Sequence, residues 1–107
     1  MDNNIIENLN EDQLIQSYLI AIDNRNKDEV EFLFNKANEY NIKKDIVFEM
    51  YNRYQLNSKR LEFIMEQCTA YLNISSKLVK KLMKNNYKQL LEIIFNHFNF
   101  FLIIYLF

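Results

Sequence analysis

The sequence predicts an all-α fold in which three helix-turn-helix units stack as a short α-solenoid. Its 107 residues contain no Gly and no Pro, and half of them are apolar. The chain therefore lacks the usual turn residues of sheet-rich folds and the Gly-rich loops that bind phosphate. An apolar fraction of this size is enough for one domain with a core. The repeating unit is indicated by a pattern of apolar, Glu and three apolar residues, found at residues 30–34, 61–65 and 91–95.

A polar leader, residues 1–12, precedes the first helix. Asn10 and Gln13 have the spacing of a capping box, in which each side chain accepts a hydrogen bond from the other residue's backbone N–H. A polar connection at residues 23–28 separates the first helix from the second. Its Asn residues are expected to take the left-handed conformation that Gly normally supplies.

Helices of two types alternate along the chain, and each apolar stripe occupies one face of a 3.6-residue helix. The first type recurs at steps of 32 residues, as Leu14/Ile15/Tyr18/Leu19, Ile46/Val47/Met50/Tyr51 and Leu78/Val79/Leu82/Met83. The second type recurs at steps of 31 and 30, as Val30/Leu33/Phe34/Ala37, Leu61/Ile64/Met65/Cys68 and Leu91/Ile94/Phe95/Phe98. The expected N-caps of the third, fourth and fifth helices are Asp45, Asn57 or Ser58, and Ser75 or Ser76.

These patterns divide the chain into three helix pairs, residues 13–42, 43–73 and 74–98, followed by an apolar tail at residues 99–107. Each second-type helix also has an apolar residue opposite its stripe, namely Phe32, Phe63 and Ile93. A lone amphipathic helix has no use for a second apolar face, whereas stacking of neighbouring units buries both. The last unit looks truncated, as if the array continued.

A period of 30 to 32 residues, built as helix, short polar turn and helix, resembles the ankyrin repeat. Residues 24–34 and 84–95 are similar to that family's turn and outer helix, although its Thr-Pro-Leu-His start and closing Gly are absent. The resemblance covers most of residues 13–98 and implies a non-catalytic scaffold for protein-protein interaction. The contacts it implies are the solvent-facing residues of the first-type helices, with no fixed binding residues and an unidentified partner.

Cys68 and His97 are the residues that would suggest a nucleophile and its base. In the repeat register Cys68 falls on the buried stripe and His97 on a polar position, so they are not expected to meet, as nucleophilic catalysis requires. Glu31, Glu62 and Glu92 recur at one repeat position. Because adjacent packed helices lie roughly 10 Å apart, these carboxylates are expected to be solvated rather than to share a proton or a metal ion. No catalytic, cofactor or metal site is predicted.

A stripe of lysines runs along the fifth predicted helix and its exit, at the helical spacing of Lys77, Lys81, Lys84 and Lys88. Such a stripe suits nucleic acid or an anionic membrane, but a solvated face is its commoner role, and interleaved aromatics for base stacking are missing apart from Tyr87. Residues 1–50 hold 11 acidic and 5 basic side chains, against 3 and 8 in residues 51–107. The balancing acidic half argues against general affinity for polyanions.

The tail has no polar side chain after Asn99, whereas a terminal repeat normally presents a polar outer face. A membrane span needs about 20 predominantly apolar residues, and extending the tail backwards includes Glu92. Three alternatives to the packed scaffold therefore stay open for Phe100–Phe107: membrane association together with the lysines, self-association, or a truncated gene product. The single cysteine and the absence of a signal-peptide pattern predict a cytoplasmic protein, and the Asn/Ile/Lys bias is typical of an AT-rich genome.

Overall fold

The structure, a computed structural model, describes residues 10–98 and is all-helical over that range. Its elements, in chain order, are α2 (Glu11–Asp23), α3 (Lys27–Glu39), α4 (Ile46–Asn52), α5 (Ser58–Phe63), the π-helical turn η1 (Ile64–Cys68), α6 (Ser76–Lys84) and α7 (Lys88–His97). The chain divides into two compact units at Lys44 and Asp45, and each is described by itself. The all-α prediction is confirmed for the described residues.

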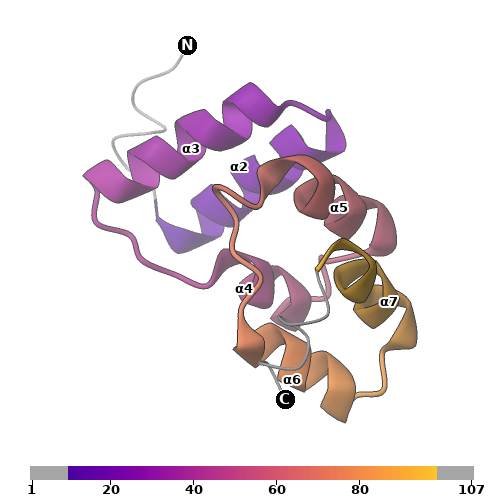
Figure 1. Ribbon diagram of the computed structural model, residues 1–107. Coiled ribbons are helices and arrows are strands. Elements are labelled where there is room, and N and C mark those ends of the chain that lie inside the picture. Colours follow the sequence, from indigo (N-terminus) through magenta and orange to yellow (C-terminus); the bar gives the residue numbers. More distant parts are fainter. Residues whose placement is uncertain (1–9, 99–107) are drawn as a thin grey trace. The chain divides into compact units, whose positions relative to one another are not determined.

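The first unit contains one antiparallel helix pair, α2 against α3 (Figure 1). The predicted capping box is confirmed: the Gln13 backbone N–H donates to Asn10 Oδ1 at 2.9 Å, and the Asn10 N–H donates to Gln13 Oε1 at 3.2 Å. This cap starts α2 at Glu11, so the last two residues expected in the leader are helical. Residues 1–9 of the leader lie outside the described residues.

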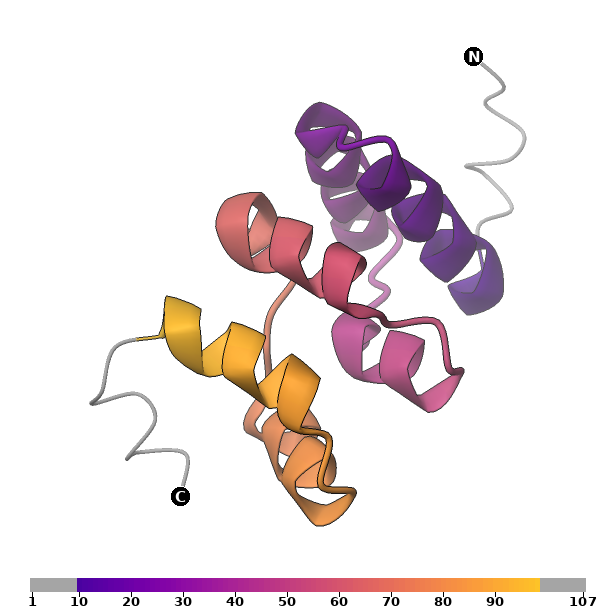
Figure 2. The same ribbon diagram turned by 90° about the vertical axis from the view of Figure 1, so that its right-hand side faces the viewer.

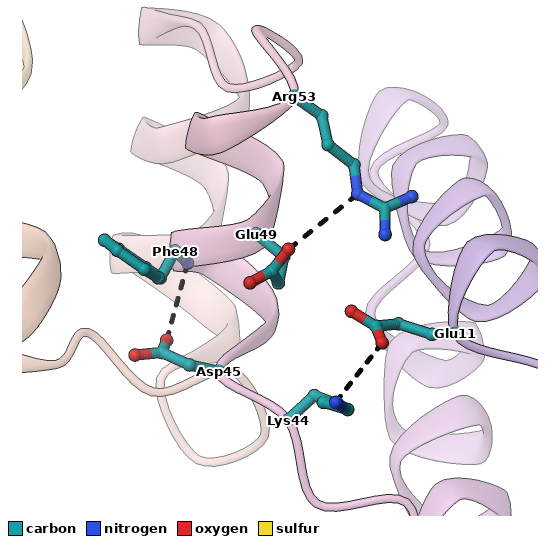
Figure 3. A network of polar contacts seen from close by, with 6 residues as sticks. All are labelled: Glu11, Lys44, Asp45, Phe48, Glu49 and Arg53. Carbon is teal, nitrogen blue, oxygen red and sulfur yellow. Dashed lines mark hydrogen bonds and ion pairs between the residues drawn. The ribbon is translucent and has the colours of Figure 1, made fainter.

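The predicted stripes form the core between α2 and α3. Seven of these side chains are buried, and they are Leu14, Ile15, Tyr18, Leu19, Val30, Leu33 and Ala37. Phe34, the eighth member, is half-buried. Lys44 and Glu11, at the two ends of this unit, form an ion pair of 3.4 Å (Figure 3). An exposed pair of this kind contributes little to stability, so the apolar stripe holds the two helices together.

The second unit contains two helix pairs, in which like helices lie against each other. α4 contacts α6, while α5 and η1 contact α7 (Figure 2). The predicted caps are confirmed, with Asp45, Asn57 and Ser75 accepting from the backbone N–H three residues on. Figure 3 shows the Asp45 cap on the Phe48 N–H at 3.4 Å and, one turn along, the Glu49–Arg53 ion pair at 3.9 Å.

Hydrogen bonds join α4 to α6 at both ends. At the start of the helices, Ser75 Oγ donates to Asp45 Oδ2 at 2.6 Å, so the two N-capping side chains are bonded to each other. At the far end, Asn85 Nδ2 donates to the Tyr51 hydroxyl oxygen at 2.8 Å. The partners are separated by 30 and 34 residues. These two bonds fix the register of α4 against α6 over their length.

The last helix is rotated from the predicted orientation by about one residue. α7 buries Leu90 and Ile94, whereas Leu91 is half-buried. Periodicity does not separate Leu90 from Leu91, because both are apolar; α7 packs against α5, α6 and η1, and Leu90 is the one that becomes buried. Met83, also expected in a buried stripe, is 41% exposed. Of the three side chains predicted on a second apolar face, Phe63 is buried, and the other two are half-buried.

Four turns use the left-handed conformation without glycine, at Arg25, Asn41, Tyr54 and Asn86. Each turn closes with the two backbone hydrogen bonds of a Schellman motif, as when Tyr54 N–H donates to the Tyr51 carbonyl and Gln55 N–H to the Met50 carbonyl. The prediction that Asn supplies this conformation in the first connection is wrong, because Arg25 adopts it there; Asn adopts it in two later turns, at Asn41 and Asn86. The Arg25 guanidinium donates to the Ile22 carbonyl at 2.7 Å, which helps to hold that turn.

Replacing Tyr54 with Gly is expected to stabilise the protein by about 0.5–1 kcal/mol. The φ of 60° at Tyr54 costs an L-residue about 1–2 kcal/mol, and Gly would remove this strain. Part of the gain is offset, because an unfolded chain with Gly has more conformational entropy to lose on folding. Asn86→Gly is the matched comparison and should gain less, since Asn tolerates this conformation. Urea midpoints measure both, and an Asn86 gain equal to or above that of Tyr54 contradicts the explanation.

The buried phenol of Tyr18 makes the fold sensitive to alkali. Tyr18 is 1% exposed, and desolvation raises its pKa well above the ordinary value near 10. The folded chain therefore keeps this proton at a pH where the unfolded chain has lost it. The contribution to stability is complete below about pH 10 and is lost as the pH rises further, by up to about 1.4 kcal/mol per pH unit.

Tyr18→Phe is expected to flatten the alkaline decline in the free energy of unfolding. Tyr54→Phe is its control, because it removes a phenol that is 96% exposed. Urea titrations at a series of pH values above 9 measure the slope. A decline as steep in Tyr18→Phe as in the unchanged chain contradicts the role of the buried phenol.

Candidate functional site

The cysteine and histidine occupy different environments, as the repeat register predicts. Cys68 lies in η1 with none of its surface exposed, and His97 is exposed at the end of α7. A thiol shut off from solvent cannot reach a substrate. Cys68 is a core residue here, where it packs as a small apolar side chain.

The recurring glutamates and the lysines are all on the surface. Glu31, Glu62 and Glu92 are exposed on α3, α5 and α7. Within residues 10–98, no group of three His, Cys, Asp or Glu side chains is placed to hold a metal ion. The exposure of the three carboxylates agrees with the expectation that they are solvated.

The predicted lysine stripe lies along α6 and ends at the first residue of α7. Lys77, Lys81 and Lys84 are exposed on α6, as is Lys80, and Lys88 is exposed at the start of α7. We call the four α6 residues the lysine row. The Lys77 ammonium stands 4.8 Å from the centre of the Phe48 ring, a cation-π contact that anchors one end of the row to α4.

A hollow between the ends of α4 and α6 combines aromatic and polar side chains. We call it the tyrosine hollow, and its lining residues are Tyr51, Asn52, Tyr54, Lys81, Asn85 and Tyr87. Its volume is about 200 Å³. That is below the roughly 300–1,000 Å³ of pockets that enclose small molecules. The lining contains no carboxylate, so the hollow offers ring faces, amides and one ammonium group.

Two of the three rings in the hollow, those of Tyr51 and Tyr87, are held in position by contacts. Tyr51 and Tyr87 meet edge to face, with ring centres 6.0 Å apart and planes at 78°. Asn85 fixes the Tyr51 hydroxyl from the other helix, through the 2.8 Å bond described above. Tyr54 stands 96% exposed on its left-handed turn. The positive φ of Tyr54 strains its backbone, and strain of this kind is found at binding sites more often than elsewhere.

Sequence reasoning missed this hollow, although it named two of its residues. Tyr51 was assigned to a buried stripe and is half-buried, and Tyr87 was noted as a lone aromatic beside the lysines. The available signal was an aromatic residue at or beside the turn of both later helix pairs. Sequence alone does not bring these turns together, because that depends on contacts between α4 and α6.

The apolar tail, Phe100–Phe107, lies outside the described residues. Within the described part, none of the helices combines the length and apolar character that crossing a membrane requires. No protein-family model, curated protein or solved structure matches the chain.

Proposed function

We propose that the chain is a non-catalytic helical-repeat scaffold that binds a segment of another protein at the tyrosine hollow. On this proposal the three helix pairs stack as a short, divergent ankyrin-like solenoid in the cytoplasm. The first-type helices and the turns that follow them form the binding face. The partner contributes an extended or turned peptide, because a shallow open hollow suits a side chain rather than an enclosed cofactor.

Like-on-like packing in the second unit supports the repeat part of the proposal. α4 lies against α6, and α5 lies against α7. This is the arrangement expected of adjacent repeats, in which each repeat contacts the next through equivalent helices. The Ser75–Asp45 bond joins equivalent capping positions. The first helix pair has the same turn chemistry, with Arg25 in the place of Tyr54 and Asn86.

The observation that carries the binding part is the tyrosine cluster, in which Tyr51 and Tyr87 are held by contacts and Tyr54 is exposed beside them. Tyrosine presents a large, rigid, amphipathic surface at low cost in conformational entropy, which is why it is enriched in protein-binding sites. The edge-to-face contact of Tyr51 and Tyr87 and the Asn85 bond set the rings before any partner arrives. Pre-organisation of this kind raises affinity by lowering the entropy lost on binding.

Selection from a random-peptide phage library on the immobilised full-length chain tests this function. We expect enriched peptides that lose affinity about tenfold or more when Tyr54 is replaced by Asn, as is typical of a central aromatic contact. Asn removes the ring and still tolerates the left-handed conformation of the turn. Tyr40→Asn is the control, because Tyr40 is another exposed tyrosine, at the C-cap of α3, and lies outside the hollow. No enrichment, or equal binding to the Tyr54→Asn variant, contradicts the proposal.

Membrane association is a second candidate function, favoured by the exposed lysine row. Lysines near an anionic lipid surface each contribute about 1 kcal/mol, which would assist an apolar anchor at Phe100–Phe107. To distinguish membrane association from the scaffold function, the expressed chain and a version ending at Asn99 are each partitioned between an alkaline wash and detergent. A full chain that needs detergent, when the shortened one does not, favours membrane association or self-association through the tail. Lipid-selective binding then separates those two.

A further inference from the structure

The lysine row and the tyrosine hollow form one continuous surface on α6. Lys81 belongs to both, because it lines the hollow and follows Lys77 by one helical turn. α6 carries four lysines and no acidic residue. Opposite the row, Leu78, Val79 and Leu82 are buried, which directs the ammonium groups to solvent.

No ion pair within residues 10–98 neutralises the lysine row. Lys36, Lys44 and Arg53, which do form ion pairs, all lie outside α6. On α4, Glu49 pairs with Arg53, and the Asp45 carboxylate accepts from Ser75 and from the Phe48 N–H rather than pairing with a lysine of the row. The surface therefore presents uncompensated positive charge that leads into an aromatic hollow free of carboxylates.

We propose that the partner segment is an acidic peptide, whose carboxylates lie along the lysine row and whose adjoining apolar side chain enters the tyrosine hollow. This inference rests on the proposed function and specifies the chemistry of the partner. α6 has nine residues and is therefore about 13 Å long, which matches about four residues of extended peptide. Four acidic residues followed by an apolar one fit both parts of the surface.

Fluorescence polarisation with two labelled peptides tests the inference on the full chain. One contains four Glu residues followed by Leu, and the other has Gln in place of each Glu. We expect the acidic peptide to bind at least about tenfold more tightly at about 0.1 M salt, with most of that advantage lost at about 1 M, where the Debye length falls to about 3 Å. The triple variant Lys77→Gln, Lys81→Gln, Lys84→Gln should abolish the preference.

A charge-matched control separates a local effect from net charge. The triple variant Lys27→Gln, Lys43→Gln, Lys59→Gln removes three exposed lysines from other elements and should keep the preference. Equal binding of both peptides, lost in Tyr54→Asn but kept in the α6 variant, overturns the acidic partner and leaves peptide binding standing. Binding of neither peptide, together with failed phage selection, overturns both proposals. Tighter binding of single-stranded polyuridylate or of phosphatidylserine vesicles than of the acidic peptide, lost in the α6 variant, also overturns it and assigns the row to nucleic acid or lipid.

Discussion

Replacing Leu61 with Asp is expected to unfold the second unit at room temperature. Leu61 has none of its surface exposed, and it starts the buried side of α5 that continues through Ile64 and Cys68. An unpaired carboxylate there costs several kcal/mol, a large part of the roughly 5–15 kcal/mol by which domains are stable. Among the described residues, the core contains no buried polar or charged side chain that could pair with this carboxylate.

Circular dichroism and urea titration measure this loss. The neighbouring substitution Glu62→Ala is the control, because Glu62 is exposed on the same helix and its removal should change stability by at most about 0.5 kcal/mol. Leu61→Ala is the milder version and should cost about 2–5 kcal/mol while leaving a measurable transition. An unchanged midpoint in Leu61→Asp would show that α5 does not pack as the structure places it.

The helices and their caps were predictable because both depend on residues close in sequence. Apolar residues spaced three and four apart define a helical face, and an Asn, Asp or Ser before that face starts the helix. Asp45, Asn57 and Ser75 follow this rule, and the structure selects them where sequence left two choices. The rotation of α7 was not predictable, since Leu90 and Leu91 serve the pattern equally well.

The tyrosine hollow was not predictable because it is made by two long-range conditions. Tyr51 must meet Tyr87 and Asn85 across more than 30 residues of chain, which depends on the register of α4 against α6. Tyr54 must also accept a positive φ, which sequence propensity assigns to Asn or Gly first. The lysine stripe at Lys77, Lys81, Lys84 and Lys88, in contrast, follows from helical spacing alone and is exposed as predicted.

Replacing Val30 with Asp provides the sharpest test of the proposed stack of three pairs. Val30 is fully buried in α3, so its substitution should unfold the first helix pair by the same burial of an unpaired charge. In a repeat array, the total stability is the sum of the intrinsic stability of each repeat and the interface energy between neighbouring repeats. Loss of the first pair should therefore also weaken the pairs that follow it.

Hydrogen exchange followed by mass spectrometry measures the protection of backbone amides in each of the two units separately. We expect the amides of α2 and α3 to lose protection in Val30→Asp, and those of α5 to exchange at least about tenfold faster than in the unchanged chain, equivalent to about 1.4 kcal/mol of lost neighbour stabilisation. Glu31→Ala, one residue along on the exposed side of α3, should leave both units protected. Full protection of α5 beside an unfolded α3 would mean that the first pair folds as a separate domain. The stacked-repeat proposal would then be wrong. The proposal that the tyrosine hollow binds a peptide would be unaffected, because α4, α6 and their turns form the hollow.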